Sequence, residues 1–356
     1  MDDRINWDRV EKAAKREGRK IVWKPYGFPE VLDPFASAFV NGLDVAPRWQ
    51  LPDPVIVSAA ITGAFFSKKT NPAQPLTTGE IRASAEECLD AGASTVHIHV
   101  RDDRGYNILD QERFREVIEP LRAGRPDLAV DGCLVPALEG WWERIKLVLD
   151  AGLLDSTPVN TTAVYTGDTL FAKPIHVMLE KARLIQECGA KVQIAVYTDA
   201  DVDNARRYLV DSGLVAKPLY WIVLPALPGC SPMHNPRQMI EGLTRMVNSI
   251  RDVDERSIIM VCAAGRASTY LTALALIMGL HVRVGMEDSV WLWPHRDDLI
   301  TSNAQHVRLA ANLVQTLGRR IATQAEYRDL IGLPSRARGQ SDIARTHEVV
   351  PGAQKH

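Results

Sequence analysis

Short apolar runs, rich in β-branched residues, recur along most of the chain and are separated by longer amphipathic stretches. Near-continuous apolar runs of this kind are typical of parallel strands that are covered on both faces. We therefore predict a strand at each of eight runs, which lie at residues 55–59, 95–100, 128–130, 157–160, 192–196, 220–224, 257–261 and 281–285.

Helical periodicity fills the intervals between these runs. The clearest helix start is at Thr77, where a threonine cap precedes Glu80, an acid in the first turn. Glycines such as Gly92 and Gly152 follow helical segments and can cap their C-termini. Helices are predicted over residues 77–91, 111–121, 141–151, 175–188, 201–212, 236–250, 268–278 and 303–317.

The alternation of eight strands with eight helices predicts an α/β fold, the closed (β/α)8 or TIM barrel, over residues 51–334. A doubly wound open sheet is the alternative. That fold often carries a G-x-G-x-x-G motif after its first strand, and this sequence has none there. The pattern therefore favours the barrel.

Both ends of the chain lie outside the repeat. Residues 1–50 are predicted to form an N-terminal arm, with a short basic helix over Asp8–Arg16 and then a segment rich in proline and aromatic residues. Residues 335–356 are predicted to form a polar C-terminal tail. The arm could pack on the barrel or bury its aromatic side chains on a neighbouring subunit, and on the second possibility we expect a homo-oligomer.

The composition excludes several classes of protein. A net charge of −2 and a pI of about 6.5 do not suit a nucleic-acid-binding protein. No apolar run reaches the roughly 18 to 20 residues of a membrane helix, and the acidic N-terminus does not resemble a signal peptide. The five cysteines form no C-x-x-C pair, so we expect reduced thiols in a cytoplasmic protein.

Two histidines lie on the second predicted strand, in His97-Ile98-His99. Residues i and i+2 of a strand point to the same face, so both imidazoles would face the barrel interior near the strand's end. Buried imidazoles are costly without partners, and a divalent metal removes that cost because imidazole is a common ligand. Hydrogen-bonded core histidines are the alternative.

A cluster of charges ends the last predicted strand, in Arg283-Val284-Gly285-Met286-Glu287-Asp288. Charged residues at the C-terminal end of a barrel strand are typical of an active site. Across the mouth from the histidines, Glu287 can complete a set of two histidines and one carboxylate, which suits zinc, iron or manganese. An ion network that only closes the barrel is the alternative.

Weaker candidates lie in the loops at the same mouth. Arg101 and Asp102 follow the histidines, and either could orient a ligand imidazole or lie on the loop surface. Hydroxyl, amide and backbone groups there can hold a carboxylate or carbonyl, although helix capping explains many such residues. The candidates for substrate binding are Thr62, Gly63, Thr162, Asn303 and Cys133.

These motifs resemble the beta-keto acid cleavage enzyme family, whose founding activity is 3-keto-5-aminohexanoate cleavage. The likeness runs from Pro54 to Leu333. It is carried by Ala60-Ile61-Thr62-Gly63-Ala64, Asn71-Pro72, Pro75-Leu76-Thr77, Ala91-Gly92-Ala93, His97-Ile98-His99-Val100-Arg101-Asp102, Gly105, residues 283–288, Ser302-Asn303-Ala304-Gln305, Ala322-Thr323 and Leu330-Ile331-Gly332-Leu333.

The resemblance implies a zinc-dependent TIM barrel that condenses a β-keto acid with acetyl-CoA and releases acetoacetate and a new CoA thioester. His97, His99 and Glu287 match the family's zinc ligands, and Arg283 and Asp288 match its catalytic arginine and aspartate. Zinc would act as a Lewis acid on the keto oxygen, and Asp288 would take part in proton abstraction. The expected partners are therefore a small keto acid and acetyl-CoA.

The sequence departs from the family's pattern around the metal, which indicates a divergent member with a different substrate. With fewer acids present, a cationic amine on the substrate fits less well. The loop at residues 290–294 suggests an apolar or aromatic wall. The departures are Phe65-Phe66 in place of an acid, Gln193 or Ala195 in place of the strand-five glutamate, Gly132-Cys133-Leu134-Val135-Pro136 in place of a Ser-Thr-Gly-Gly turn, and Thr162 or Ala163 at the expected threonine.

The missing carboxylates leave a second reaction class open. A CoA-independent, metal-dependent hydrolase or lyase on the same barrel would use a metal-bound water. Dependence of turnover on acetyl-CoA separates this enzyme from the cleavage enzyme. A metal-binding protein without catalysis is the third possibility, and in it Asp288→Asn would change little.

Overall fold

The computed structural model describes residues 5–17, 48–166, 169–227 and 229–334. Its contacts divide the chain into two units, residues 1–51 and residues 52–356. In the first unit, helix α1 (Trp7–Glu17) overlaps the helix predicted over Asp8–Arg16. The predicted tail at 335–356 lies outside the described residues, and the division into arm, barrel and tail stays a prediction.

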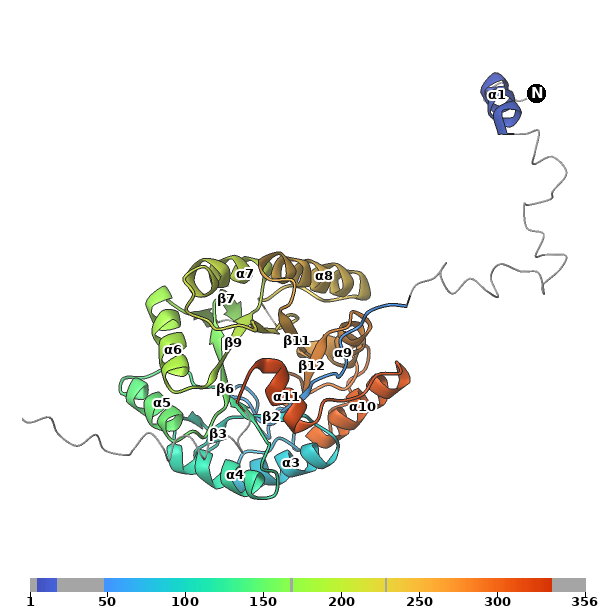
Figure 1. The fold of residues 1–356 in the computed structure, drawn as a ribbon. Coiled ribbons are helices and arrows are strands. Elements are labelled where there is room, and N and C mark those ends of the chain that lie inside the picture. The colour runs from blue at the N-terminus through green and yellow to red at the C-terminus, as the bar shows by residue number, and fades with distance from the viewer. Residues whose placement is uncertain (1–4, 18–47, 167–168, 228, 335–356) are drawn as a thin grey trace, which may run out of the picture. The chain divides into compact units, whose positions relative to one another are not determined.

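The second unit is built around a closed barrel of eight parallel strands, which confirms the predicted fold (Figure 1). The strands follow one another around the barrel in chain order, and the first pairs with the last, with Val57 aligned to Val282. The barrel strands are β1 (Val57–Ala60), β2 (Thr95–Ile98), β5 (Val130–Gly132), β6 (Ser156–Asn160), β9 (Lys191–Val196), β10 (Tyr220–Val223), β11 (Ile258–Cys262) and β12 (His281–Val284).

A helix follows each barrel strand and packs on the outside of the barrel (Figure 1). Local signals start several of them, such as the capping box between Thr77 and Glu80. None of the described helices has the length and apolar character that a bilayer crossing requires. The helices are α3 (Thr78–Asp90), α4 (Gln111–Ala123), α5 (Trp141–Asp150), α6 (Ile175–Glu187), α7 (Asp199–Ala205) with a π-helical turn over Arg206–Val210, α8 (Pro236–Val253), α9 (Ser268–Ile277) and α10 (Asn303–Thr316).

Two apolar layers hold the barrel together. One layer lies between strands and helices and includes Val57, Val96 and Leu243, all fully buried. The other fills the barrel interior, where Tyr220 contacts Tyr327 of helix α11 (Gln324–Ile331). Burial of an aliphatic side chain such as Val57 or Leu243 stabilises the fold by about 1.5–3 kcal/mol. Helix α11, which the apolar pattern does not predict, therefore closes the barrel end opposite the predicted site.

The structure adds two antiparallel β-hairpins that the apolar pattern also does not predict. Strand β3 (Val100–Arg101) pairs with β4 (Asn107–Ile108), and β7 (Ala163–Thr166) pairs with β8 (Thr169–Ala172). Each hairpin continues the chain beyond a barrel strand, at the C-terminal mouth. Strands this short carry too few apolar positions to give a clear alternation.

Candidate active site

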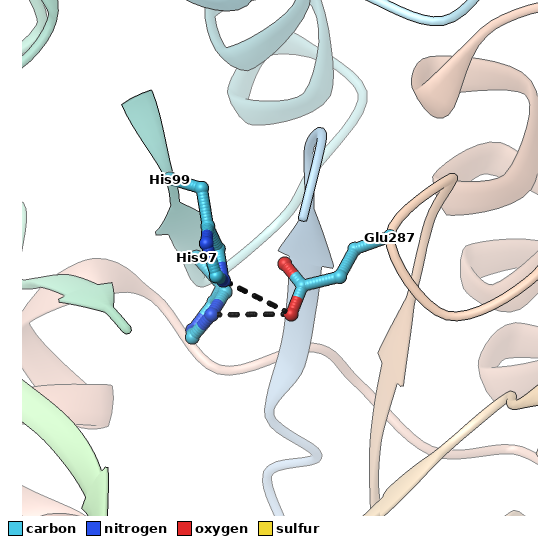
Figure 2. A group of neighbouring side chains, drawn as sticks. All are labelled: His97, His99 and Glu287. Atoms are coloured by element: carbon cyan, nitrogen blue, oxygen red, sulfur yellow. Dashed lines mark ion pairs between the residues drawn. The ribbon is translucent and has the colours of Figure 1, made fainter. Parts of the chain in front are cut away.

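Three side chains at or just beyond the ends of two barrel strands meet at the C-terminal mouth. His97 lies on β2, His99 just beyond its end and Glu287 in the loop after β12, and Figure 2 shows the carboxylate facing both imidazoles. Oε1 of Glu287 lies 3.3 Å from Nε2 of His97 and 3.4 Å from Nε2 of His99. All the donor atoms lie within 4.8 Å of one another, so the three residues could hold one metal ion.

The spacing of these atoms fits a divalent metal. Zinc bonds to histidine nitrogen and carboxylate oxygen are about 2.0–2.2 Å long, so neighbouring ligand atoms around a tetrahedral ion lie about 3.3–3.5 Å apart. The two nitrogen-to-oxygen distances match this spacing. Within the described parts of the chain, Nε2 of His97 and Oε2 of Glu287 are buried and have no hydrogen-bond partner. A bound cation would satisfy both atoms.

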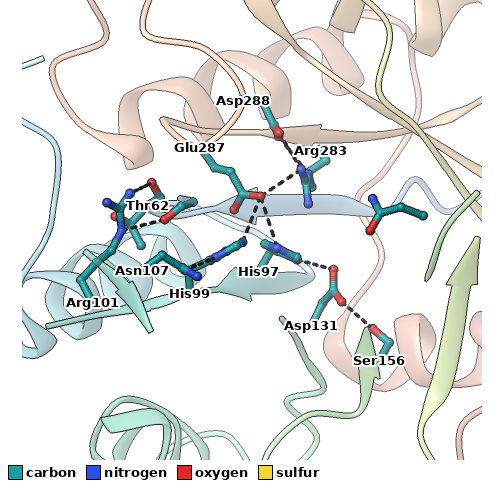
Figure 3. A network of polar contacts seen from close by, with 12 residues as sticks. Thr62, His97, His99, Arg101, Asn107, Asp131, Ser156, Arg283, Glu287 and Asp288 are labelled. Carbon is teal, nitrogen blue, oxygen red and sulfur yellow. Dashed lines mark hydrogen bonds and ion pairs between the residues drawn. The ribbon is translucent and has the colours of Figure 1, made fainter. Parts of the chain in front are cut away.

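Each imidazole is oriented by a partner on its other nitrogen (Figure 3). Nδ1 of His97 lies 2.7 Å from Oδ2 of Asp131, and Nδ1 of His99 lies 2.8 Å from Oδ1 of Asn107. Asp131 sits directly opposite His97 in the β2–β5 register and also accepts a hydrogen bond from Ser156. Such partners fix the tautomer that turns Nε2 toward a metal. Sequence reasoning missed both residues, although a lone acid in an apolar strand is a signal for Asp131.

The charges of the cluster favour a cation at its centre. Burial alone would lower the pKa of each imidazole, but Glu287 acting together with Asp131 at His97, and with Cys133 at His99, outweighs burial. The pKa of His97 rises to about 9 and that of His99 to about 10. Burial alone would raise the pKa of Glu287, yet His97, Arg283 and His99 hold it well below its usual range. The neighbouring carboxylates therefore favour positive charge at the two imidazoles, which either a proton or a bound metal ion supplies.

Arg283 and Asp288 form a buried ion pair beside the three potential ligands (Figure 3). Nε of Arg283 donates to Oδ2 of Asp288 at 2.9 Å, and Nη2 donates to Oδ1 at 2.5 Å. The same Nη2 lies 3.3 Å from Oε1 of Glu287. Burial raises the pKa of Asp288 although Arg283 opposes the shift. The two-point contact fixes the orientation of the carboxylate.

Two glycines allow the loops to approach this closely. Gly63 has φ +60°, and a Cβ atom there would lie 2.4 Å from Cγ of Glu287. Gly285 has φ +140°, and its Cβ would lie 2.1 Å from the carbonyl oxygen of Ala60. Only glycine adopts such backbone angles readily. Gly63 therefore leaves room for a potential metal ligand, and its predicted contact with substrate stays a prediction.

Two of the other predicted substrate-binding residues have their polar atoms engaged with backbone. The hydroxyl of Thr62 donates to the carbonyl of Pro75 at 2.5 Å. Asn303 is fully buried, and its amide accepts from the N–H of Met286 at 2.7 Å and donates to the carbonyl of Ile61 at 2.8 Å. These contacts hold the loops at the mouth. A direct role in substrate binding stays a prediction for both residues.

Cys133 and Thr162 lie on the next part of the mouth. The thiol of Cys133 contacts His99. Burial would raise its pKa, but that contact, together with nearby cations, lowers it to about 7. Thr162 is buried beyond β6 near Asp201, and within the described residues its hydroxyl has no hydrogen-bond partner. Cys133 is thus the predicted substrate-binding residue whose side chain contacts a potential metal ligand.

Arg101 and Asp102 shape loops, and within the described residues neither forms a hydrogen bond with a ligand imidazole. The guanidinium of Arg101 donates to the carbonyls of Gly63 at 2.8 Å and of Thr62 and Phe66 at 3.1 Å. Asp102 is partly exposed and accepts from backbone N–H groups within the β3–β4 turn at 2.9 Å. Arg101 therefore fixes the loop after β1, which carries Gly63.

A cavity of about 680 Å³ opens beside the ion pair, between the loops after β10, β11 and β12. Gly265 lines the cavity and connects it to the ion pair, because its N–H donates to the backbone carbonyl of Asp288 at 2.9 Å. Arg266 lies over the ring of Trp291, with 4.2 Å between Cζ and the ring centroid. The described lining is mostly apolar, includes Tyr270 and contains no acid. The predicted apolar wall at 290–294 contributes Trp291 and Pro294.

Comparison with known proteins identifies the family to which this chain belongs. The chain matches the model of the beta-keto acid cleavage enzyme family over residues 54–333. It is 33% identical over 285 residues to a 3-keto-5-aminohexanoate cleavage enzyme of Fusobacterium nucleatum, covering 78% of this chain and 98% of that protein. It is 27% identical over 286 residues to a 3-oxoadipate:acetyl-CoA acetyltransferase of Cupriavidus necator, covering 79% and 96%.

A solved structure agrees with the fold. The apo structure of ObcA has a TM-score of 0.64 to this chain at 18% identity, over 74% of this chain and 66% of ObcA. The family model spans the whole barrel, from three residues before β1 to two residues beyond α11. This protein therefore belongs to the beta-keto acid cleavage enzyme family and is an enzyme of the carbon–carbon bond-cleaving class.

Proposed function

We propose that this protein cleaves a β-keto acid with acetyl-CoA, giving acetoacetate and the CoA thioester of the remaining acyl group. One observation carries the proposal: His97, His99 and Glu287 face one point at the mouth, with a buried Arg283–Asp288 pair beside them. The relatives support the same class of reaction, since one of them is named for acetyl transfer from acetyl-CoA to a keto acid.

His97, His99 and Glu287 would hold zinc, with iron or manganese as alternatives for this ligand set. When bound, the metal supplies a Lewis acid for the keto oxygen and stabilises developing negative charge. Asp131 and Asn107 would keep the Nε2 atoms turned toward it. The fit of the donor distances supports zinc as well as any other ion of similar size.

Asp288 is the base in this proposal, and Arg283 is the residue that orients it. Asp288 removes a proton from C2 of the keto acid, and C2 attacks the thioester carbonyl of acetyl-CoA. A carbon–carbon bond forms and the CoA thiolate leaves. The thiolate then attacks the original keto carbon, the bond between that carbon and C2 breaks, and C2 regains the proton as acetoacetate leaves.

Acetyl-CoA would bind in the cavity beside Asp288. Its volume of about 680 Å³ lies within the range of small-molecule pockets, about 300–1,000 Å³. The apolar lining suits a pantetheine arm, and Arg266 would bind a phosphate group by exchanging its present partner Asp297, to which it donates at 2.6 Å. Gly265, whose N–H is bonded to Asp288, would lie where the thioester meets the keto acid.

The proposal includes a cytoplasmic homo-oligomer. All five cysteines are free, as expected in a reducing compartment. We expect the arm within residues 1–50 to bury its aromatic side chains against a neighbouring subunit. Light scattering of the purified protein tests the oligomer, and a monomeric mass would contradict this part of the proposal.

Mass spectrometry of β-keto acid reactions, run with and without acetyl-CoA, tests the reaction itself. We expect acetoacetate and a new CoA thioester in equal amounts, and only when acetyl-CoA is present. Asp288→Asn should lower kcat by about 10²- to 10⁴-fold while the metal stays bound, as expected when a base is removed. Product without acetyl-CoA would contradict the proposal and favour the metal-dependent hydrolase or lyase.

A further inference from the structure

Two lysines outside the metal cluster line one small cavity near the mouth. Lys173 lies just before α6 and Lys181 lies on it, and both face the ends of β5 and β6. Apolar side chains such as Val135 and Met178 complete the cavity, together with Asn160. The volume is about 10 Å³, which is room for about one water molecule. The cavity is thus apolar apart from Asn160 and two cationic side chains, a lining that suits an anion.

The charge of these lysines is only partly balanced by nearby groups, of which Cys133 and Asp131 favour the charged form of Lys181. Lys181 is 4% exposed, and its ammonium donates to the carbonyl of Pro158 at 2.6 Å. Over the described ranges of the chain, neither Lys173 nor Lys181 forms an ion pair with an acid. Burial lowers the pKa of Lys181 to about 8, which leaves most of it protonated at neutral pH. A buried cation without a counter-ion is costly, so an anionic ligand would relieve that cost.

A set of contacts joins Lys173 and the lysine cavity to the barrel interior. The ammonium of Lys173 lies 4.5 Å from the ring centroid of Phe171, whose ring packs edge-on against Tyr197 at 5.7 Å. The hydroxyl of Tyr197 accepts from Asn160, which lines the lysine cavity, at 2.8 Å. Tyr197 belongs to the barrel interior. The lysines therefore lie one side-chain layer outside the interior of the mouth.

A second route runs through the loop after β5. The thiol of Cys133 contacts His99, and Lys173 and Lys181 lie near enough for their charges to act on the same thiol. The neighbouring interior position on β9 is Ala195, which offers no charge. Cys133 therefore lies close both to the potential metal ligand His99 and to the two lysines.

We propose that Lys173 and Lys181 bind a second carboxylate at the far end of the β-keto acid, so that the substrate is a dicarboxylic β-keto acid. This inference rests on the proposed function and specifies its substrate. The flexible four-carbon stems of the lysines let their ammonium groups swing to admit a carboxylate, which the cavity as it stands is too small to hold.

Steady-state kinetics with three six-carbon acids test the inference: 3-oxoadipate, 3-oxohexanoate and 5-amino-3-oxohexanoate. The first ends in a carboxylate and the second in a methyl group. The third also ends in a methyl group, next to a carbon that carries an ammonium group. We expect kcat/KM to favour 3-oxoadipate over each of the others by about 10- to 100-fold, the effect of a charged hydrogen bond. Preference for the neutral or the cationic acid would overturn the inference.

Methionine variants of the lysines locate the effect, because methionine keeps most of the aliphatic stem. Lys173→Met and Lys181→Met should each lower kcat/KM for 3-oxoadipate by about 10- to 100-fold, mainly through KM, with little change for 3-oxohexanoate. Lys173→Arg should restore much of the loss. Lys146→Met, on the exposed surface of α5, is the matched control. Equal losses for all three acids would indicate a structural role and overturn the inference.

Binding without turnover separates this inference from the reaction. If acetyl-CoA supports no cleavage of any keto acid, the proposed function fails, and calorimetric titration with adipate and hexanoate still tests the lysines. Tighter binding of adipate, weakened by Lys173→Met, supports the anion site. Equal binding of the two acids overturns it.

Discussion

At the scale of single residues, the site depends on side chains that do not themselves reach the metal position. Asp131 holds Nδ1 of His97 and Asn107 holds Nδ1 of His99, and so each Nε2 atom faces Glu287. Asp131 is 1% exposed and is itself held by Ser156. The imidazoles are therefore fixed before any ligand arrives, which reduces the cost of assembling the site.

Asp131→Asn tests this dependence. The amide removes a negative charge beside His97 and can present an N–H where the imidazole needs an acceptor. We expect metal affinity to fall by about 10- to 100-fold, as is typical when a partner of a ligand histidine is changed. Competition with a chelating dye measures the affinity. Asp150→Asn, an exposed acid on α5, is the control, and an Asp131→Asn protein that binds metal as tightly as the parent would refute the assigned role.

At the scale of elements, the site is built where loops from opposite ends of the sequence close the barrel. The loop after β1 and the loop after β12 meet at Gly63 and Glu287, and Arg101 holds the first loop by its carbonyls. β1 and β12 are paired, so the first and last strands bring these loops together. The strand pairing that closes the barrel therefore also brings together the two loops that build the site.

Gly63→Ala should displace the side chain of Glu287, because the new Cβ atom would overlap with it. We expect loss of bound metal as well as a lower Tm. Gly152→Ala separates the two effects, since Gly152 also has φ +60° but a Cβ there meets nothing within 4 Å. That control should show only the backbone cost, about 1–2 kcal/mol, with metal content unchanged. Retention of metal by Gly63→Ala would contradict the packing described.

At the scale of the whole molecule, buried histidines make stability depend on pH. His306 on α10 is fully buried, and among the described residues neither ring nitrogen has a hydrogen-bond partner. Burial lowers its pKa from 6.5 to about 4. Between those pH values the unfolded chain binds a proton that the folded chain does not, so stability falls as pH falls through this window, by up to about 1.4 kcal/mol per pH unit.

His306→Leu should therefore flatten the loss of stability between pH 6.5 and pH 4. The apolar side chain also removes an unpaired polar group from the core, so the free energy of unfolding should rise at pH 5 relative to the parent. Urea unfolding at several pH values measures both effects. His176→Leu, which changes an exposed histidine on α6, is the control. An unchanged slope in His306→Leu would show that this imidazole is not kept neutral by the fold.

The barrel could be predicted from the sequence because each of its strands is covered on both faces, which leaves a strong local pattern. The potential metal ligands could also be predicted, since His97-Ile98-His99 and Glu287 lie in short motifs. Asp131 could not, because it acts across a strand pair on a residue 34 positions away. The cavity beside Asp288 and the lysine cavity are built from separate loops, whose meeting depends on the closed fold.

Elemental analysis of the purified protein tests the central claim most directly. The account predicts about one zinc ion, or one ion of another divalent metal, per chain. His97→Ala and Glu287→Gln should each lose it, while Lys146→Met on the surface should keep it. A folded parent protein that binds no divalent metal, or variants that retain it fully, would contradict the account.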